Sequence, residues 1–396
     1  MESGLLSLFP DLQREVAAHT TGILPSQRIE EFIQARHITA SVPILPSQVQ
    51  PASLDLRLGE VAYRVRASFL PGRAATVLSK TEELKSHEID LSRPTVLERG
   101  CVYIVPLMEE WHLPAQISGK VNPKSTTGRL DIFTRLITDY GSEFERVPNG
   151  YKGPLYVEIV PRTFSIVVQA GVALNQVRFI RGTPPPSDTA LSELHEQEAL
   201  LYLEDVAVEE PPIEHGLWIS VDLEGEGTSD IIGYRAKAHA PPVDLSTVDY
   251  YDPLEFWDPI PRPRARRLIL NPEEFYILAS RERVRVPPEF AAEMVGYDPS
   301  VGEFRIHYAG FFDPGFGYGS NDILGTHAVL EVRSHEVPFV LDHGQRVGRF
   351  VYERLLTQPD KIYGRSIGSS YERQRLSLSK QFKRMPLPGS GVDGSA

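Results

Sequence analysis

The chain has 396 residues, of which 41% are hydrophobic and 24% are charged, a balance typical of a globular protein with two ordinary domains. The net charge of −12 argues against a nucleic-acid binder but leaves small nucleotides open as substrates. The single cysteine, Cys101, excludes an intrachain disulfide framework.

The sequence also carries an expectation about the compartment. One lone cysteine favours a reducing, cytoplasmic location. The first residues lack the basic start and long apolar run of a signal peptide. No stretch reaches the roughly 18 uninterrupted apolar residues of a membrane span. We therefore expect a soluble cytoplasmic protein that contacts neither membrane nor nucleic acid.

In chain order, the local patterns predict a mostly β fold with a few short helices. Two helices are expected near the N-terminus, the second with Ser26 as its N-cap before residues 28–33. The 33 prolines argue against long helices, because each interior proline costs about 3 kcal/mol. Short β-branched runs between Gly and Pro predict strands at 102–105, 155–160, 164–168 and 329–332.

The composition changes between the two halves of the chain. Three consecutive prolines open an acidic stretch, and we interpret residues 184–215 as a connector with a short helix around 190–202. The Gly/Ser-rich end, residues 386–396, is predicted to be disordered.

An internal repeat relates the two halves. Residues 113–117 align with 287–291, and a nearly constant offset then pairs Gly128 with Gly302, Asp139 with Asp313, Glu158 with Glu331, and Gly171 with Gly344. The order of these matches favours a tandem duplication of one β fold. The alternative is two unrelated β domains.

Several classes of catalytic site are excluded by their missing motifs. A zinc-dependent deaminase needs an H-x-E and a P-C-x-x-C motif, and the chain has one cysteine and no H-x-E. A Walker loop is also absent. The letters of a G-x-S-x-G elbow occur at 364–368 and those of a G-x-G-x-x-G turn at 389–394, but no strand followed by a helix, which both sites require, is predicted there.

The segment 122–130 is the strongest remaining candidate. Lys124, Ser125, Thr126 and Thr127 offer the positive charge and hydroxyl donors that phosphate oxygens require, and Gly128 allows a close backbone approach. Arg129 could point into the same pocket. On composition alone, an ordinary polar loop remains the alternative.

Together with other motifs, this segment resembles the dCTP deaminases of the trimeric dUTPase-like superfamily. The early strand 50–59 matches through Asp55 and Arg57, and the loop 124–129 matches the phosphate and active-site loop. The strand 153–158 matches the one that carries the catalytic glutamate. Residues 171–179 include the family's glutamine at Gln176, and the tail residues Tyr363, Tyr371 and Gln374 keep its spacing.

The resemblance implies two dUTPase-like lobes of β-barrel or jelly-roll type. It implies a catalytic lobe at 1–183, a degenerate lobe at 216–358 and a nucleotide-covering tail at 359–385. The implied reaction is hydrolysis of dCTP to dUTP and ammonia, which feeds dUMP and dTTP synthesis. It implies an oligomer, with a trimer as the first expectation, and allows dTTP as an inhibitor.

The resemblance also assigns roles within the site. Glu158 would activate water for attack on C4 of cytosine without a metal, because one partly buried carboxylate can carry protons in both directions. Ser125 and Arg129 would position the water and balance charge. The nucleotide, as its Mg²⁺ complex with no zinc, would contact Lys124, Thr126, Thr127, Gly128, Asp139, Tyr156, Val157, Gln176, Tyr363, Tyr371 and Gln374.

Departures from the family pattern refine these expectations. Residues 140–152 are inserted where the family has a tight turn after its aspartate, and Ser370 replaces a tail lysine, a charge that Lys361 or Lys380 would supply. In the second repeat, the alignment puts Pro299 and Glu303 in place of Ser125 and Arg129. Glu331 is therefore expected to be a strand residue.

Two other functions stay open. A dUTPase, or a deaminase that also cleaves the triphosphate, would use the aspartate of the tight-turn motif, which is kept at Asp313-Pro314-Gly315 and interrupted after Asp139. The other alternative is an inactive nucleotide-binding regulator.

Overall fold

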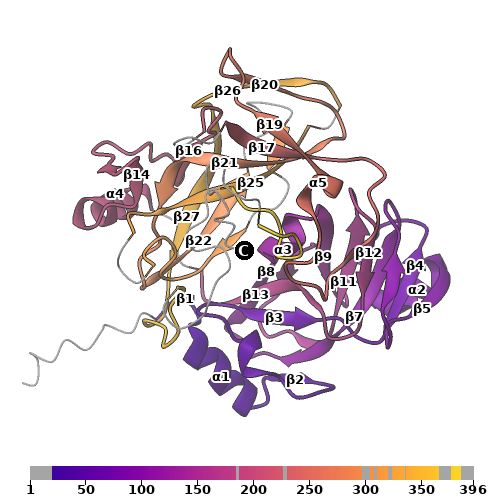
Figure 1. Ribbon diagram of the computed structural model, residues 1–396. Coiled ribbons are helices and arrows are strands. Elements are labelled where there is room, and N and C mark those ends of the chain that lie inside the picture. The colour runs from indigo at the N-terminus through magenta and orange to yellow at the C-terminus, as the bar shows by residue number, and fades with distance from the viewer. Residues whose placement is uncertain are drawn as a thin grey trace, which may run out of the picture.

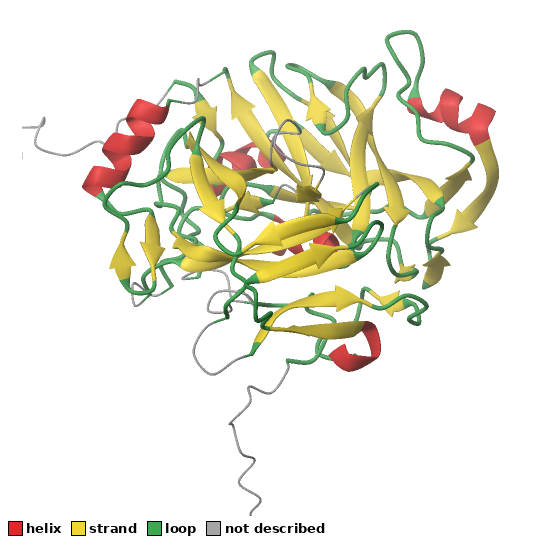
Figure 2. Ribbon diagram, turned by 90° about the horizontal axis from the view of Figure 1, so that it is seen from above, coloured by secondary structure: helices red, strands yellow, loops and turns green. Residues whose placement is uncertain are grey.

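The computed structural model describes residues 20–183, 187–225, 230–296, 304–306, 310–319, 323–334, 336–364 and 376–384, with the backbone alone described for 304–306. The expectation of a mostly β fold is confirmed. Figure 2 shows strands making up most of the molecule, with short helices mainly around its periphery. None of the helices in these ranges is long and apolar enough to cross a membrane.

The first lobe consists of two main sheets with three short helices. One sheet runs β3 (Leu54–Arg57), β13 (Ala173–Arg181), β8 (Ile117–Pro123), β10 (Arg146–Val147), with β1 (Gly22–Ile23) also on β13. The other runs β5 (Lys85–Asp90), β4 (Val61–Val65), β7 (Val102–His112), β11 (Lys152–Pro161), β9 (Ile132–Thr138), with β2 (Ile38–Ala40) on β7. The helices are α1 (Ser26–Gln34), α2 (Val77–Leu84) and α3 (Ser125–Gly128), and a 3₁₀ turn spans Pro46–Gln48.

The second lobe repeats both strand orders. Its first sheet runs β16 (Leu217–Ser220), β27 (Arg346–Arg354), β22 (Phe290–Gly296), β24 (Phe311–Phe312). Its second runs β19 (Trp257–Pro261), β17 (Ile231–Ala236), β21 (Phe275–Val284), β25 (Thr326–Ser334), β23 (Phe304–Ile306). Smaller pairings join β6 (Thr95–Leu97) to β12 (Ile166–Val168), β12 to β18 (Val243–Asp244), and β20 (Arg267–Leu270) to β26 (Phe339–Asp342).

The segment predicted as a connector is built into the second lobe. It contains α4 (Asp188–Gln197), β14 (Leu201–Leu203) and β15 (Val206–Ala207), and β14 pairs with β21. Residues 386–396 lie outside the described part of the chain. Ser26 is the first residue of α1 and not its cap, because Pro25 occupies the cap position and Ser26 Oγ donates to Gln27 instead.

The two lobes share a hydrophobic core. One cluster of buried side chains combines Leu130, Val157 and Phe164 of the first lobe with Trp257 and Ile277 of the second. The Phe164 and Trp257 rings meet edge-to-face, 5.5 Å apart. Because such apolar contacts cross the interface, the lobes dock as one body. Figure 1 shows α3 at the centre of the molecule, between the indigo-to-magenta first lobe and the orange second lobe.

Candidate active site

The α3 loop is held against β13 by hydrogen bonds from both of its ends. The N–H of Lys124 and the hydroxyl of Thr127 both donate to the carbonyl of Leu174, each at 2.8 Å. Thr127 is buried, so its hydroxyl serves the loop itself, whereas Ser125 is exposed. Arg129 closes the single helical turn and is also largely buried. This arrangement brings Ser125 and Arg129 together on one rigid turn.

The carboxylate that meets this turn belongs to the second lobe. Glu331 lies on β25, where Leu330 and Val332 point into the core of the second lobe, so Glu331 faces the first lobe. A methyl group at Gly128 would lie 2.7 Å from Glu331 Oε2, which shows how closely the carboxylate packs on α3.

Glu331 has the electrostatic surroundings of a proton-transfer group. Burial, together with the charge of Asp131, raises the pKa of Glu331 to about 8, and Arg129 opposes that rise. A carboxyl group that titrates near neutral pH can both accept and donate a proton during one reaction.

Glu158 is not part of this cluster, contrary to the sequence-based expectation. On β11, Val157 and Ile159 point into the shared core beside Leu130, so Glu158 lies on the opposite face. Its Oε1 accepts hydrogen bonds from Arg135 at 2.6 and 3.0 Å. Glu158 is fully buried in this ion pair.

Two segments of the first lobe cover the Glu158 face. Val77 of α2 packs in one cluster with Tyr156, and Tyr156 lies on the same face of β11 as Glu158. The insertion 140–152 contributes Phe144, whose ring lies 3.6 Å from the guanidinium of Arg135. The corresponding face of β25 is instead the one that docks on the first lobe. Tyr156 accordingly belongs to a packing cluster of the first lobe, and Val157 to the core that the two lobes share.

A row of polar side chains leads from α3 along the first sheet. Gln176 of β13 lies between Asp55 of β3 and Asn122 of β8 in the strand register. Lys124 forms an ion pair with Asp55, and burial raises the pKa of that carboxyl while Lys124 and Lys380 oppose the rise.

The C-terminal tail reaches the same place within one chain. Ser379 Oγ donates to the carbonyl of Thr126 at 3.0 Å, and Phe382 packs in the shared core. The Lys380 side chain is exposed overall, but its ammonium group lies near Lys124, and partial desolvation together with Lys124 lowers the pKa of Lys380. Two cations at this point form a favourable place for a multiply charged anion.

Other tail residues lie elsewhere. The Tyr363 N–H donates to the carbonyl of Pro314, and its ring contacts Phe316. Lys361 pairs with Glu30 of α1 and is therefore separate from Lys380. Tyr371 and Gln374 lie outside the described residues, as do Pro299 and Glu303 of the second repeat.

The two aspartates of the repeat have different surroundings. Asp139 accepts a hydrogen bond from the N–H of Val77 at 2.7 Å, so the structure places it at the start of α2. Asp313, in contrast, crosses to the first lobe and forms an ion pair with Arg178 at 3.6 Å. Burial raises the pKa of Asp313, Arg178 lowers it, and Asp55 and Lys124 are close enough to contribute.

The sequence predicted the α3 loop together with Glu158, whereas the structure places Glu331 of the second lobe against that loop. The repeat had already paired Glu331 with Glu158, and each lies opposite an isoleucine in its sheet, Ile277 and Ile104. The sequence signal that could have pointed to this contact is that the second repeat lacks Ser and Arg at the aligned loop positions, so Glu331 has no such pair in its own lobe.

Comparisons with known proteins agree with this architecture. Residues 20–183 match the family described as 2'-deoxycytidine 5'-triphosphate deaminase (DCD) N-terminal domain, and residues 187–382 match the C-terminal domain of that family. The crystal structure of 2'-deoxycytidine 5'-triphosphate deaminase from Agrobacterium tumefaciens is 52% identical. It covers 88% of this chain and all of its own, with a TM-score of 0.83.

Curated relatives match over shorter regions. Two proteins named dCTP deaminase, dUMP-forming, from Halobacterium salinarum and Nocardia farcinica, are 32% and 30% identical. The matches cover 27% and 32% of this chain, and 52% and 61% of those relatives. Both halves of this chain match one family, and a solved relative is matched over its whole length, so the chain belongs to the 2'-deoxycytidine 5'-triphosphate deaminase family.

Proposed function

We propose that this protein deaminates dCTP to dUTP and ammonia at a site shared by its two lobes. The observation that carries the proposal is the meeting of Glu331, with a pKa near 8, and the Ser125–Arg129 turn. Family membership and the printed names of the relatives support the substrate. The lobes themselves represent a tandem duplication, which the repeated strand order supports.

Glu331 is the proton carrier in the proposed mechanism. Its carboxylate takes a proton from water as the oxygen attacks C4, and the proton passes to N3 of the ring. A second proton from the attacking oxygen then goes to the amino group, the C4–N bond breaks, and ammonia leaves. Ser125 orients the water, and Arg129 stabilises the charged carboxylate and the tetrahedral intermediate.

The remaining polar residues hold the nucleotide. Lys124 and Lys380 bind the triphosphate, Gln176 and Thr126 lie beside them, and the tail closes over α3. The backbone of Val329 and Leu330, at the repeat positions of Tyr156 and Val157, reads the base. The phosphate end is cationic and its Asp55 is paired with Lys124, which fits Mg²⁺ arriving on the phosphates and neutralising part of their charge.

The test compares two glutamate variants. Glu331→Gln removes the proton carrier, so we expect turnover of dCTP to fall by about 10³-fold or more, with nucleotide binding retained. Glu158→Gln keeps the hydrogen-bonding shape beside Arg135, so we expect near-normal turnover and a lower melting temperature. Ammonia release and the absorbance change of the base measure turnover in both variants, and thermal unfolding measures the melting temperature.

The two variants separate the possible assignments. Loss of turnover in the Glu158 variant, with retention in the Glu331 variant, would return the active site to the first lobe. A wild-type protein that binds dCTP and releases no ammonia would instead be a nucleotide-binding regulator.

A second candidate product is dUMP. Curated relatives carry the name dUMP-forming, and Asp313 of the intact tight turn lies near Asp55 and Lys124. The interruption after Asp139 therefore no longer weighs against triphosphate cleavage. Chromatography of the products decides: dUTP with ammonia supports deamination alone, and dUMP with pyrophosphate supports both reactions.

A homotrimer and inhibition by dTTP stay proposals that follow from the family. Light scattering tests the first. Titration of dTTP against the deamination rate tests the second.

A further inference from the structure

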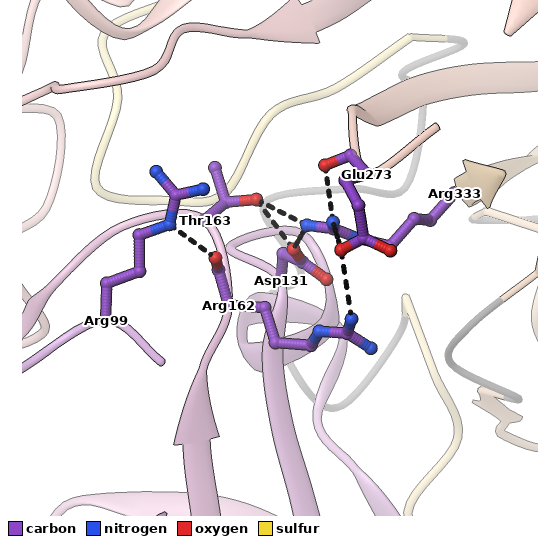
Figure 3. A network of polar contacts seen from close by, with 6 residues as sticks. All are labelled: Arg99, Asp131, Arg162, Thr163, Glu273 and Arg333. Atoms are coloured by element: carbon purple, nitrogen blue, oxygen red, sulfur yellow. Dashed lines mark hydrogen bonds and ion pairs between the residues drawn. The ribbon is translucent and has the colours of Figure 1, made fainter. Parts of the chain in front are cut away.

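A buried ion pair joins the two lobes directly behind the candidate site. Arg333 of β25 donates to Asp131 Oδ2, and both side chains are almost completely inaccessible to solvent. Thr163 Oγ1 donates to the same oxygen at 2.6 Å and accepts from Arg333 Nη2 at 3.0 Å. Figure 3 shows Asp131 and Thr163 of the first lobe converging on the guanidinium of Arg333.

The pair extends into a wider set of contacts. Arg333 Nη1 reaches Glu273 Oε2 at 3.3 Å, and Arg162 Nη2 approaches the same carboxylate at 3.5 Å (Figure 3). The N–H of Arg162 also donates to the carbonyl of Asp131 at 3.0 Å. The side chain of Asp131 is therefore tied to the second lobe, and its backbone is tied to Arg162 of the first lobe.

Both members of the pair stand two residues from a proposed catalytic group. Asp131 follows Arg129 on the α3 side, and Arg333 follows Glu331 on β25. Side chains two residues apart on a strand share a face, so Arg333 points to the same side as Glu331. The ion pair thus connects the two segments whose separation sets the distance from Glu331 to the Ser125–Arg129 turn.

The backbone at Asp131 adds a second observation. Its φ is 54°, a left-handed conformation that disfavours side chains with a Cβ, although Asp tolerates it better than most. This turn directs the Asp131 carboxylate to Arg333 at a backbone cost that Asp tolerates.

We infer that the Asp131–Arg333 pair positions Glu331: it holds the Glu331 carboxylate against the α3 turn across the lobe interface. The inference rests on the proposed function. Both side chains are buried in the interface, and neither belongs to the proposed nucleotide-binding set. They act through Arg129 and Glu331, which belong to different lobes, so the docking of the lobes sets the distance between them.

The charges around Glu331 give this role a distinctive signature. Arg129 and Asp131 face it from the first lobe, and Arg333 lies beside it on β25, with Glu273 and Arg162 farther along the network. Removing Asp131's charge leaves the cations in excess and lowers the pKa of Glu331. Removing the charge of Arg333 leaves the anion in excess and raises it.

The experiment measures kcat, KM and the pH profile of dCTP deamination in Asp131→Asn and Arg333→Met. We expect kcat to fall by about 10²-fold in each, because a shift of roughly 1 Å between reacting groups has that effect. We expect KM to stay near the wild-type value, since Lys124 and Lys380 are untouched. The pH inflection of kcat/KM should move down in Asp131→Asn and up in Arg333→Met.

Two further variants keep the test decisive. Thr163→Val removes the two hydrogen bonds that Thr163 makes with the pair and keeps both charges, so it should give a smaller loss of kcat. It serves as the test if the charge variants fold poorly. Glu293→Gln breaks another ion pair between the lobes, with Lys120, and should lower the melting temperature without moving the pH inflection.

The outcomes distinguish the two proposals. Wild-type kcat and an unmoved inflection in both charge variants, while Glu331→Gln is inactive, would overturn the positioning role alone. Equal shifts in Glu293→Gln would reduce the pair to a general stabiliser of the interface. A wild-type enzyme that releases no ammonia would overturn the proposed function and, with it, the role of the pair.

Discussion

At the scale of single residues, Gly128 shows how little room the site has. A Cβ there would lie 2.7 Å from Glu331 Oε2 and 2.8 Å from Cδ. Gly128→Ala would favour helix by up to about 1 kcal/mol, yet the buried contact forces Glu331 to move. We expect kcat to fall by about 10²-fold, as for other displacements of roughly 1 Å. Steady-state kinetics with dCTP measures the loss.

Gly310 provides the matched control. An added methyl there would meet only Phe312, at an ordinary 3.7 Å. Gly310→Ala should therefore keep kcat near the wild-type value. Full activity in Gly128→Ala would show that the Glu331 carboxylate does not need its observed place against α3.

The raised pKa of Glu331 also predicts how its replacement changes stability. Below its ordinary value of 4.5, the carboxyl is protonated in folded and unfolded chains alike. Between 4.5 and about 8 the unfolded chain releases the proton and the folded chain keeps it, so this group destabilises the fold increasingly as pH rises. Glutamine carries no such penalty.

We therefore expect Glu331→Gln to be more stable than the wild type near neutral pH. The difference in melting temperature should be small at about pH 5 and larger at about pH 8, as the linkage requires. Thermal unfolding followed by circular dichroism measures it. A difference that stays constant or shrinks with pH would mean that Glu331 ionises normally in the folded protein.

At the scale of elements, the local pattern was a good guide where packing is periodic. The β-branched run 155–160 predicted β11, and 329–332 predicted the centre of β25, because strands buried on both faces are continuous apolar runs. The start of α1 was misassigned by one position, at Ser26. Local sequence does not specify that the insertion 140–152 places Phe144 on Arg135, since that contact depends on the tertiary fold.

At the scale of the whole molecule, local sequence could not show which glutamate packs on the α3 loop. Glu158 and Glu331 occupy matching strands and lie opposite matching isoleucines, so their immediate sequence and register are alike. The two glutamates differ in what packs against their strands. The helix α2 and the insertion 140–152 cover Glu158, whereas the first lobe covers Glu331. The α3 loop was predictable because its residues are contiguous; its partner depends on how the lobes dock.

The shared core makes a prediction about unfolding. Chains with two lobes commonly unfold in separate steps. Here Trp257 of the second lobe is fully buried against Phe164 of the first and Phe382 of the tail, so neither lobe can unfold without exposing the core of the other. We expect scanning calorimetry to show one transition in which the calorimetric and van't Hoff enthalpies agree.

Trp257→Ala tests the cause of that cooperativity. Truncating a buried tryptophan costs about 3–5 kcal/mol, and the loss falls on the interface between lobes. Trp111→Ala, in a cluster whose members are first-lobe residues apart from Leu356, is the matched control. We expect Trp257→Ala to broaden or split the transition, and Trp111→Ala to lower the first lobe's stability with the lobes still coupled. Two separate transitions in the wild type would show that the lobes fold independently, and the site between them would then depend on docking after folding.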